Sequence, residues 1–165
     1  MELRLFTDDD IVTHPDSGLA QVAPATAWTD EITDLGRAMF SSLAGLNAVG
    51  LAANQIGRDA RLFVADLGEG EPWFFLNAQL VARSENTEEG VEGCLSIPGH
   101  LFLVNSPEVV TATYVNEHGE ECTTTFTGYD ARVVRHEVDH LNGRVILDHG
   151  VLAEPGDAPV ENTDE

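Results

Sequence analysis

Apolar residues recur at helical spacing in two well-separated segments, 29–46 and 129–141, and this pattern constrains the fold more than any other feature. In the first segment the apolar stripe follows Thr29, a favoured N-cap residue, and acidic side chains occupy the first turn. The stripe consists of Ile32, Leu35, Met39, Leu43 and Leu46. In the second it consists of Val133, Val134, Val138 and Leu141, followed by Gly143 at the expected left-handed helix end. We therefore predict an N-terminal amphipathic helix and a second helix late in the chain.

Between these helices the sequence is typical of β-structure. Strand-like runs occupy residues 60–66, 72–81, 109–116 and 121–126, and the last two runs are expected to pair through a turn that contains Gly119. Residues 144–148 predict one further short strand. The run NAVGLAANQIG, residues 47–57, consists mainly of small residues, so we expect a loop whose backbone lies close to another group.

The length of 165 residues, with 42% hydrophobic content, suits one globular domain with its own core. We place a single catalytic domain at residues 1–152. The remaining residues, 153–165, contain five acids, two prolines and almost nothing to bury. We expect them to form an acidic, disordered tail.

A strong excess of acid limits the partners of this chain. It has 29 acidic residues against 8 basic ones, all of them arginine, and a formal charge of −21. Such a surface repels phosphate, so we expect no direct binding of nucleic acid or of anionic membranes. The acidic first ten residues cannot act as a secretory signal, so we expect a cytoplasmic protein with two free thiols, Cys94 and Cys122. The absence of lysine excludes a Schiff-base mechanism.

The chemistry is concentrated in the sequence RHEVDHLNG, residues 135–143. Residues four apart share a helix face, so His136 and His140 can bind one metal ion. Glu137 lies beside that face and need not bind the ion, which suits a proton carrier. The same pattern also occurs on ordinary solvated helices, and a metal site needs a third ligand. The candidates are Cys94, in the turn-rich segment EGCLSIPG, and downstream His149 and Glu154.

Three sequence blocks decide between these alternatives. VGLAANQ (49–55), EGCLS (92–96) and HEVDH (136–140) resemble, in order and spacing, the signature motifs of the peptide deformylases. The early HPD (14–16) and the intervening strand pattern resemble that family too. The resemblance implies metal-dependent hydrolysis of the N-formyl group from N-formylmethionyl peptides or nascent proteins, with release of formate.

The resemblance also implies a set of catalytic residues. Cys94, His136 and His140 would hold one divalent metal ion, typically Fe²⁺ in this family, with Zn²⁺, Ni²⁺ or Co²⁺ able to replace it. Glu137 would be the general base and acid. The side-chain amide of Gln55 and the backbone N–H of Leu95 would donate to the oxyanion that forms when water attacks the formyl carbon.

Other residues are assigned to the substrate and to the support of the ligands. If the family pocket carries over, a substrate site for the methionine side chain would be lined by Val49, Gly50, Tyr129 and Val133, together with Leu95. Packing in the core is the rival interpretation of these residues. Glu92 and Asp139 are candidates to orient the metal ligands through hydrogen bonds.

The sequence departs from the family pattern at several positions. Ala48 replaces a glycine that usually opens the first motif, which is harmless only if the backbone there has negative φ. Leu101 and Ser106 stand where many relatives carry arginines, so the positioning of the peptide is less determined than the binding of metal. The chain resembles the short forms of the family that lack a long C-terminal helix.

Two other functions remain open from the sequence. A catalytically inactive homologue would bind metal and N-terminal methionyl peptides, although the intact Glu137 and Gln55 argue against this reading. A zinc endopeptidase that uses the helix motif alone predicts that Cys94→Ser would spare metal binding. If the chain is a peptide deformylase, as the resemblance implies, we expect a monomeric α+β protein. Mainly antiparallel β-sheets would pack around a central metal-binding helix, with an N-terminal amphipathic helix in addition.

Overall fold

The structure of the chain, a computed structural model, describes residues 4–69, 71–148 and 150–153. Its α-helices are α1 (Asp30–Leu46) and α2 (Gly128–Leu141). A five-stranded sheet has the order β1 (Gly50–Ala52), β2 (Leu62–Asp66), β3 (Pro72–Arg83), β6 (Val109–Val115), β7 (Glu121–Thr127). A three-stranded sheet has the order β4 (Thr87–Cys94), β5 (Ile97–Pro107), β8 (Val151–Leu152). Short 3-10 helices are η1 (Asp8–Asp10), η2 (Ser17–Ala20), η3 (Ala53–Ile56) and η4 (Ile146–Asp148).

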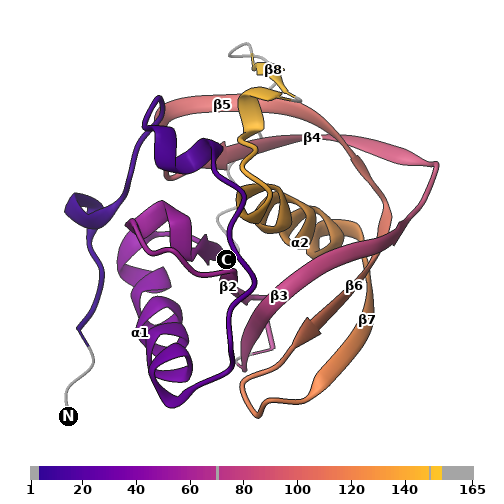
Figure 1. Cartoon of the computed structure of the whole chain (residues 1–165). Coiled ribbons are helices and arrows are strands. Elements are labelled where there is room, and N and C mark those ends of the chain that lie inside the picture. Colours follow the sequence, from indigo (N-terminus) through magenta and orange to yellow (C-terminus); the bar gives the residue numbers. More distant parts are fainter. Residues whose placement is uncertain (1–3, 70, 149, 154–165) are drawn as a thin grey trace.

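All strand pairs in the two sheets are antiparallel, and α2 lies between the sheets (Figure 1). Helix α1 lies outside this arrangement, against β1 and β2. The predicted α+β class, with antiparallel sheets around the second helix, is therefore confirmed.

Helix α1 forms where its sequence provides both ends and one apolar face. The Thr29 hydroxyl accepts a hydrogen bond from the backbone N–H of Ile32, and Asn47 ends the helix in the left-handed region with φ 54°. The buried face packs on the five-stranded sheet through Met39, Leu43 and Leu46. The predicted amphipathic helix is confirmed, with its capping residue.

Strand β2 is buried on both faces and separates two hydrophobic clusters. Leu62 and Val64 belong to the cluster under α1, whereas Phe63 and Ala65 belong to the cluster under α2. Successive side chains of a strand point to opposite faces, so this one strand supports both helices. The position of α2 is thus fixed by the same sheet that holds α1.

Four strands and the second helix lie close to their predicted ranges, and β6 pairs with β7 as expected. Gly143, with φ 74°, follows α2 in the left-handed region. The predicted strand at 144–148 is wrong, because the Asp148 carboxylate accepts a hydrogen bond from the Val145 N–H and closes the 3-10 turn η4. The loop expected at 47–57 also contains β1 and η3.

The β4–β5 hairpin was not predicted. The sequence of β4, TEEGVEGC, contains three glutamates and two glycines, so neither alternation nor β-propensity reveals a strand. The predicted acidic tail lies outside the described residues, apart from Ala153, whose N–H donates to the Leu101 carbonyl. None of the described helices has the length and apolar character required to span a membrane.

Candidate metal centre

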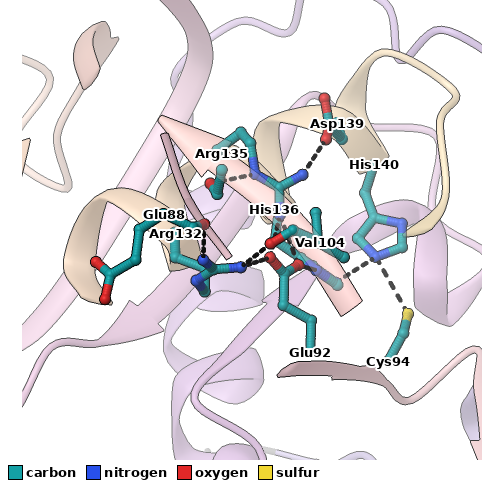
Figure 2. A network of polar contacts seen from close by, with 10 residues as sticks. Glu88, Glu92, Cys94, Val104, Arg132, Arg135, His136, Asp139 and His140 are labelled. Carbon is teal, nitrogen blue, oxygen red and sulfur yellow. Dashed lines mark hydrogen bonds and ion pairs between the residues drawn. The ribbon is translucent and has the colours of Figure 1, made fainter. Parts of the chain in front are cut away.

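Two elements that are distant in sequence bring the three candidate ligands together. Cys94 is the last residue of β4, and His136 and His140 lie one turn apart on the face of α2 that looks toward it. The cysteine sulfur and one nitrogen from each ring all lie within 4.8 Å of one another. Figure 2 shows the sulfur and both rings on the same side of the helix.

The spacing of these donor atoms fits a tetrahedral ion. With usual bond lengths, two nitrogen ligands lie about 3.3 Å apart, and a nitrogen and a thiolate sulfur lie about 3.6 Å apart. The two Nε2 atoms are separated by 3.2 Å, and Cys94 Sγ lies 3.4 Å from His140 Nε2. One thiolate and two imidazoles are a donor set that suits zinc or another divalent transition metal and leaves a fourth position for water or substrate.

Glu92 determines the tautomer of His136. Its Oε1 lies 3.0 Å from His136 Nδ1, and a carboxylate can only accept, so Nδ1 carries the proton and Nε2 presents its lone pair. Burial lowers the pKa of His136, but hydrogen bonds to Cys94 and Glu92 outweigh it and raise the pKa to about 10. A metal ion between the rings would compete with the second proton of the imidazolium, at Nε2, because the ligands bind metal in their deprotonated forms. Burial, with the charges of His136 and Arg135, lowers the pKa of His140.

Glu92 itself is held by two arginines of α2 (Figure 2). Arg132 Nη1 lies 2.5 Å from Glu92 Oε2, and Arg135 Nη2 lies 2.5 Å from Oε1. Burial raises the pKa of Glu92, but the hydrogen bond from His136 and the charge of Arg135 lower it to about 2. Arg135 also contacts Asp139, through Nη1 at 2.7 Å. Glu92 therefore lies against the candidate ligand His136, as expected, whereas Asp139 is joined to the network through Arg135.

Glu137 lies in the wall of the cavity next to the candidate ligands. Its side chain is 4% exposed, and Oε2 has no hydrogen-bond partner among the described residues. Burial dominates its electrostatics and raises its pKa to about 7. Gly50 makes room for it, because a Cβ at that position would lie 2.9 Å from Glu137 Oε1. A buried carboxyl group in the wall of a cavity, with one oxygen that has no hydrogen-bond partner, can accept and return a proton.

Gln55 presents its amide nitrogen to the same place. The backbone N–H of Ala52 donates to Gln55 Oε1, which turns Nε2 toward Cys94 Sγ at 3.6 Å and Ser96 Oγ at 3.2 Å. Leu95 lies in the turn that joins β4 to β5, beside Cys94. The three blocks singled out in the sequence thus meet around one point.

A cavity of about 600 Å³ opens over this point. Its lining includes every predicted catalytic and substrate residue except the buried His140: Val49, Gly50, Gln55, Cys94, Leu95, Tyr129, Val133, His136 and Glu137. The exposed side chains of Val49, Tyr129 and Leu101 form an apolar rim. The cavity therefore combines an apolar wall with polar groups at one end, which is typical of a site that binds a small apolar side chain next to its chemistry.

Sequence reasoning missed Arg132, Arg135 and Asn54. Asn54 Nδ2 donates to the His140 carbonyl at 2.6 Å, which ties η3 to the end of α2. The two arginines lie on the helix that was predicted to bind metal. The chain has only 8 basic residues, so the presence of two of them just before the motif could have indicated a role near the site.

The departures from the family pattern have clear structural settings. The left-handed residue at the first motif is Asn47, and Ala48 is not among the described residues with positive φ. Leu101 lines the cavity, and Ser106 is buried against Arg135, with Oγ 2.9 Å from Arg135 Nε. The alternative ligands His149 and Glu154 lie outside the described residues.

Comparison with known sequences gives a consistent result. The sequence model of the polypeptide deformylase family matches residues 9–155. A peptide deformylase from Pseudothermotoga lettingae is 43% identical over 120 residues, which span 72% of this chain and 69% of that protein. A peptide deformylase from Acinetobacter baumannii is 36% identical over 142 residues, which span 84% of this chain and 81% of that protein.

Comparison with solved structures extends the similarity to three dimensions. The crystal structure of peptide deformylase from Thermotoga maritima has a TM-score of 0.82 and 33% identity, covering 88% of this chain and 97% of that one. A peptide deformylase from Synechococcus elongatus in complex with actinonin has a TM-score of 0.83 and 32% identity, covering 91% of this chain and 82% of that one.

Proposed function

The chain belongs to the polypeptide deformylase family, a family of hydrolases, and from this premise we propose that it removes the N-formyl group from N-formylmethionyl peptides or nascent proteins, releasing formate. The observation that carries this proposal is the convergence of Cys94 Sγ and one nitrogen of each histidine ring within 4.8 Å, beside Glu137, whose Oε2 has no hydrogen-bond partner among the described residues. A surface site that only binds a metal ion would not need a buried group that carries protons.

We assign Cys94, His136 and His140 as ligands of one divalent ion, Fe²⁺ by resemblance to the family, with Zn²⁺, Ni²⁺ or Co²⁺ as replacements. The bound ion would act as a Lewis acid toward the formyl group and a water molecule. Glu137 takes a proton from the water and gives it to the leaving amine, since it lines the cavity and its Oε2 has no hydrogen-bond partner within the described part of the chain. Gln55 Nε2 and the Leu95 N–H donate to the oxygen of the formyl group as negative charge develops on it.

The methionine side chain is proposed to lie along the apolar wall formed by Val49, Gly50, Tyr129 and Val133. The formal charge of −21 supports action on free peptides or nascent chains without direct contact to nucleic acid. We propose residues 1–152 as a single catalytic domain, acting as a monomer in the cytoplasm, where nascent chains are made.

The test measures formate and metal on the same sample. Protein purified and loaded with Fe²⁺ under anaerobic conditions should release formate from a formyl-Met peptide, and an acetyl-Met peptide serves as the matched control. A Cys94→Ser variant should lose its metal, whereas retention of the metal would favour the endopeptidase alternative. Metal-loaded protein that releases no formate above background would contradict the proposed function.

A further inference from the structure

We propose that Arg135 is a positioning residue for the candidate metal centre: it holds the Glu92 carboxylate in place and, through Glu92, orients the His136 ring. This inference rests on the proposed metal site but not on the proposed substrate. The motif HEVDH begins at His136, one residue after Arg135, and the sequence alone assigns Arg135 no role.

Each of the three guanidinium nitrogens of Arg135 makes a hydrogen bond. Nη2 contacts both Glu92 oxygens, at 2.5 and 2.6 Å, and Nη1 contacts Asp139 Oδ2 at 2.7 Å. Nε lies 2.9 Å from Ser106 Oγ, and the side chain is 7% exposed. Its partners come from β4, from β5 and from α2 itself. Such a planar set of donors with several fixed acceptors determines geometry in a way that a single point charge does not.

A single atom, Glu92 Oε1, connects Arg135 to the candidate ligand His136. Glu92 Oε1 accepts from Arg135 Nη2 and lies 3.0 Å from His136 Nδ1, while His136 Nε2 is the proposed metal ligand. A shift of the Glu92 carboxylate would therefore turn the imidazole ring of His136 or allow its proton to leave Nδ1. Partners that hold a ligand in this way commonly change metal affinity about 10- to 100-fold when they are removed.

The network is also balanced in charge. Glu92 and Asp139 face Arg132 and Arg135, and the four side chains are 6 to 16% exposed. Arg132 cannot replace Arg135, because its other hydrogen bonds go to the carbonyls of Val104 and Glu88. Loss of Arg135 alone would leave an excess buried negative charge, and a third cation in the network would leave an excess positive one.

Ser106 provides the space for this arrangement. It is 1% exposed and lies on the same face of β5 as Phe102 and Val104, which is the buried face. An arginine side chain at 106 would enter the space that the Arg135 guanidinium occupies. The short side chain at 106 and the arginine at 135 thus form a matched pair, and a guanidinium group supplied from 106 in place of 135 should restore the charge.

The test removes the guanidinium group at position 135 and introduces one at position 106, on the full chain. Arg135→Gln, Ser106→Arg, the double variant and wild type are titrated with Co²⁺, with visible absorption as the readout. The Nδ1–H signal of His136 is followed by NMR in the Zn²⁺-loaded proteins. The control is Arg37→Gln on α1, which removes one arginine that is 60% exposed and 3.6 Å from its partner Asp34.

Arg135→Gln is expected to weaken Co²⁺ binding about 10- to 100-fold and to speed solvent exchange of the His136 Nδ1–H, while the control matches wild type. Ser106→Arg is expected to weaken binding as well, and the double variant to regain most of the affinity. If Arg135→Gln fails to fold, Arg135→Lys, which keeps the charge but not the planar donors, is titrated in its place and should still lose affinity.

Unchanged Co²⁺ affinity and unchanged His136 exchange in a folded Arg135 variant would overturn the inference, because lowered stability alone indicates only a structural role. A double variant no better than either single variant would overturn the pairing with Ser106. Failure of wild type to bind Co²⁺ would instead remove the proposed metal site, and this inference with it.

Discussion

Helices α1 and α2 each bury one face in the same molecule, but they bury different chemistry. The buried residues of α1 are Thr33, Gly36, Ala38, Met39, Ser42, Leu43 and Leu46, none of which is ionisable. The buried residues of α2 are Ala131, Val133, Val134, Arg135, Glu137, Val138, His140 and Leu141. Helix α2 therefore carries a cation, a carboxyl group and an imidazole into the interior, where burial of a charged group without a partner costs free energy.

The partners of the buried polar groups also differ between the helices. In α1, Ser42 Oγ donates to the Ala38 carbonyl, four residues earlier on the same helix. In α2, Arg135 bonds to Glu92 and to Ser106, which lie 43 and 29 residues away in sequence. The buried polar contacts of α1 are thus made within the helix or with the segment before it, since Ser42 Oγ also accepts from the Phe6 N–H. By contrast, the buried face of α2 is stable only when β4 and β5 are in place. The candidate site exists only in the assembled fold.

The largest expected effect is on activity and comes from Glu137→Gln. Loss of the proton carrier should lower kcat/KM for formate release about 10²- to 10⁴-fold. Metal content and unfolding free energy should change little, because Glu137 Oε2 has no hydrogen-bond partner to lose. Formate release and metal content are measured on one sample. A variant that keeps more than a tenth of wild-type activity would remove Glu137 from the proposed mechanism.

Glu92→Gln tests whether the remote partners stabilise α2. It would leave Arg132 and Arg135 buried with too little negative charge, and breaking a buried ion pair in this way costs about 3–5 kcal/mol. The matched control on α1 is Asp34→Asn, which breaks an exposed pair with Arg37 and should cost under about 1 kcal/mol. Urea unfolding of both variants gives the comparison, and similar losses would show that burial of the network contributes little.

Leu43→Ala tests the opposite side of the comparison. Leu43 is 3% exposed in the apolar cluster under α1, so its truncation should lower the unfolding free energy by about 3 kcal/mol. The Co²⁺ affinity of the folded variant should equal that of wild type, because this cluster lies on the other face of β2 from the one under α2. Weakened Co²⁺ binding would indicate that α1 supports the site as well as the fold.

The same contrast explains how much could be predicted from the sequence. Helix α1 followed from Thr29 and one apolar stripe, and the β6–β7 pair followed from two strand-like runs and a glycine turn, because all of these signals are local. Hairpin β4–β5 could not be predicted in this way, since the β4 sequence is polar and the strand forms by pairing with β5. Cys94, His136 and His140 were predicted as ligands from motifs and lie together, but Arg135 is a charged residue that the sequence alone would place on a solvated helix face. Its burial depends on Glu92 and Ser106, which no local pattern connects to it.

The smallest predicted effect separates the two helices at their first residues. Thr29 caps α1 with a hydrogen bond from the Ile32 N–H, so Thr29→Ala should lower the unfolding free energy by about 1 kcal/mol. Thr127 is the same residue type at the start of α2, but its side chain makes no capping hydrogen bond. Thr127→Ala should therefore cost clearly less in the same urea titration. Equal losses would mean that the two helix starts are held alike. A loss confined to Thr29 would mean that α1 depends on its own ends, while α2 is held in place by the sheets around it.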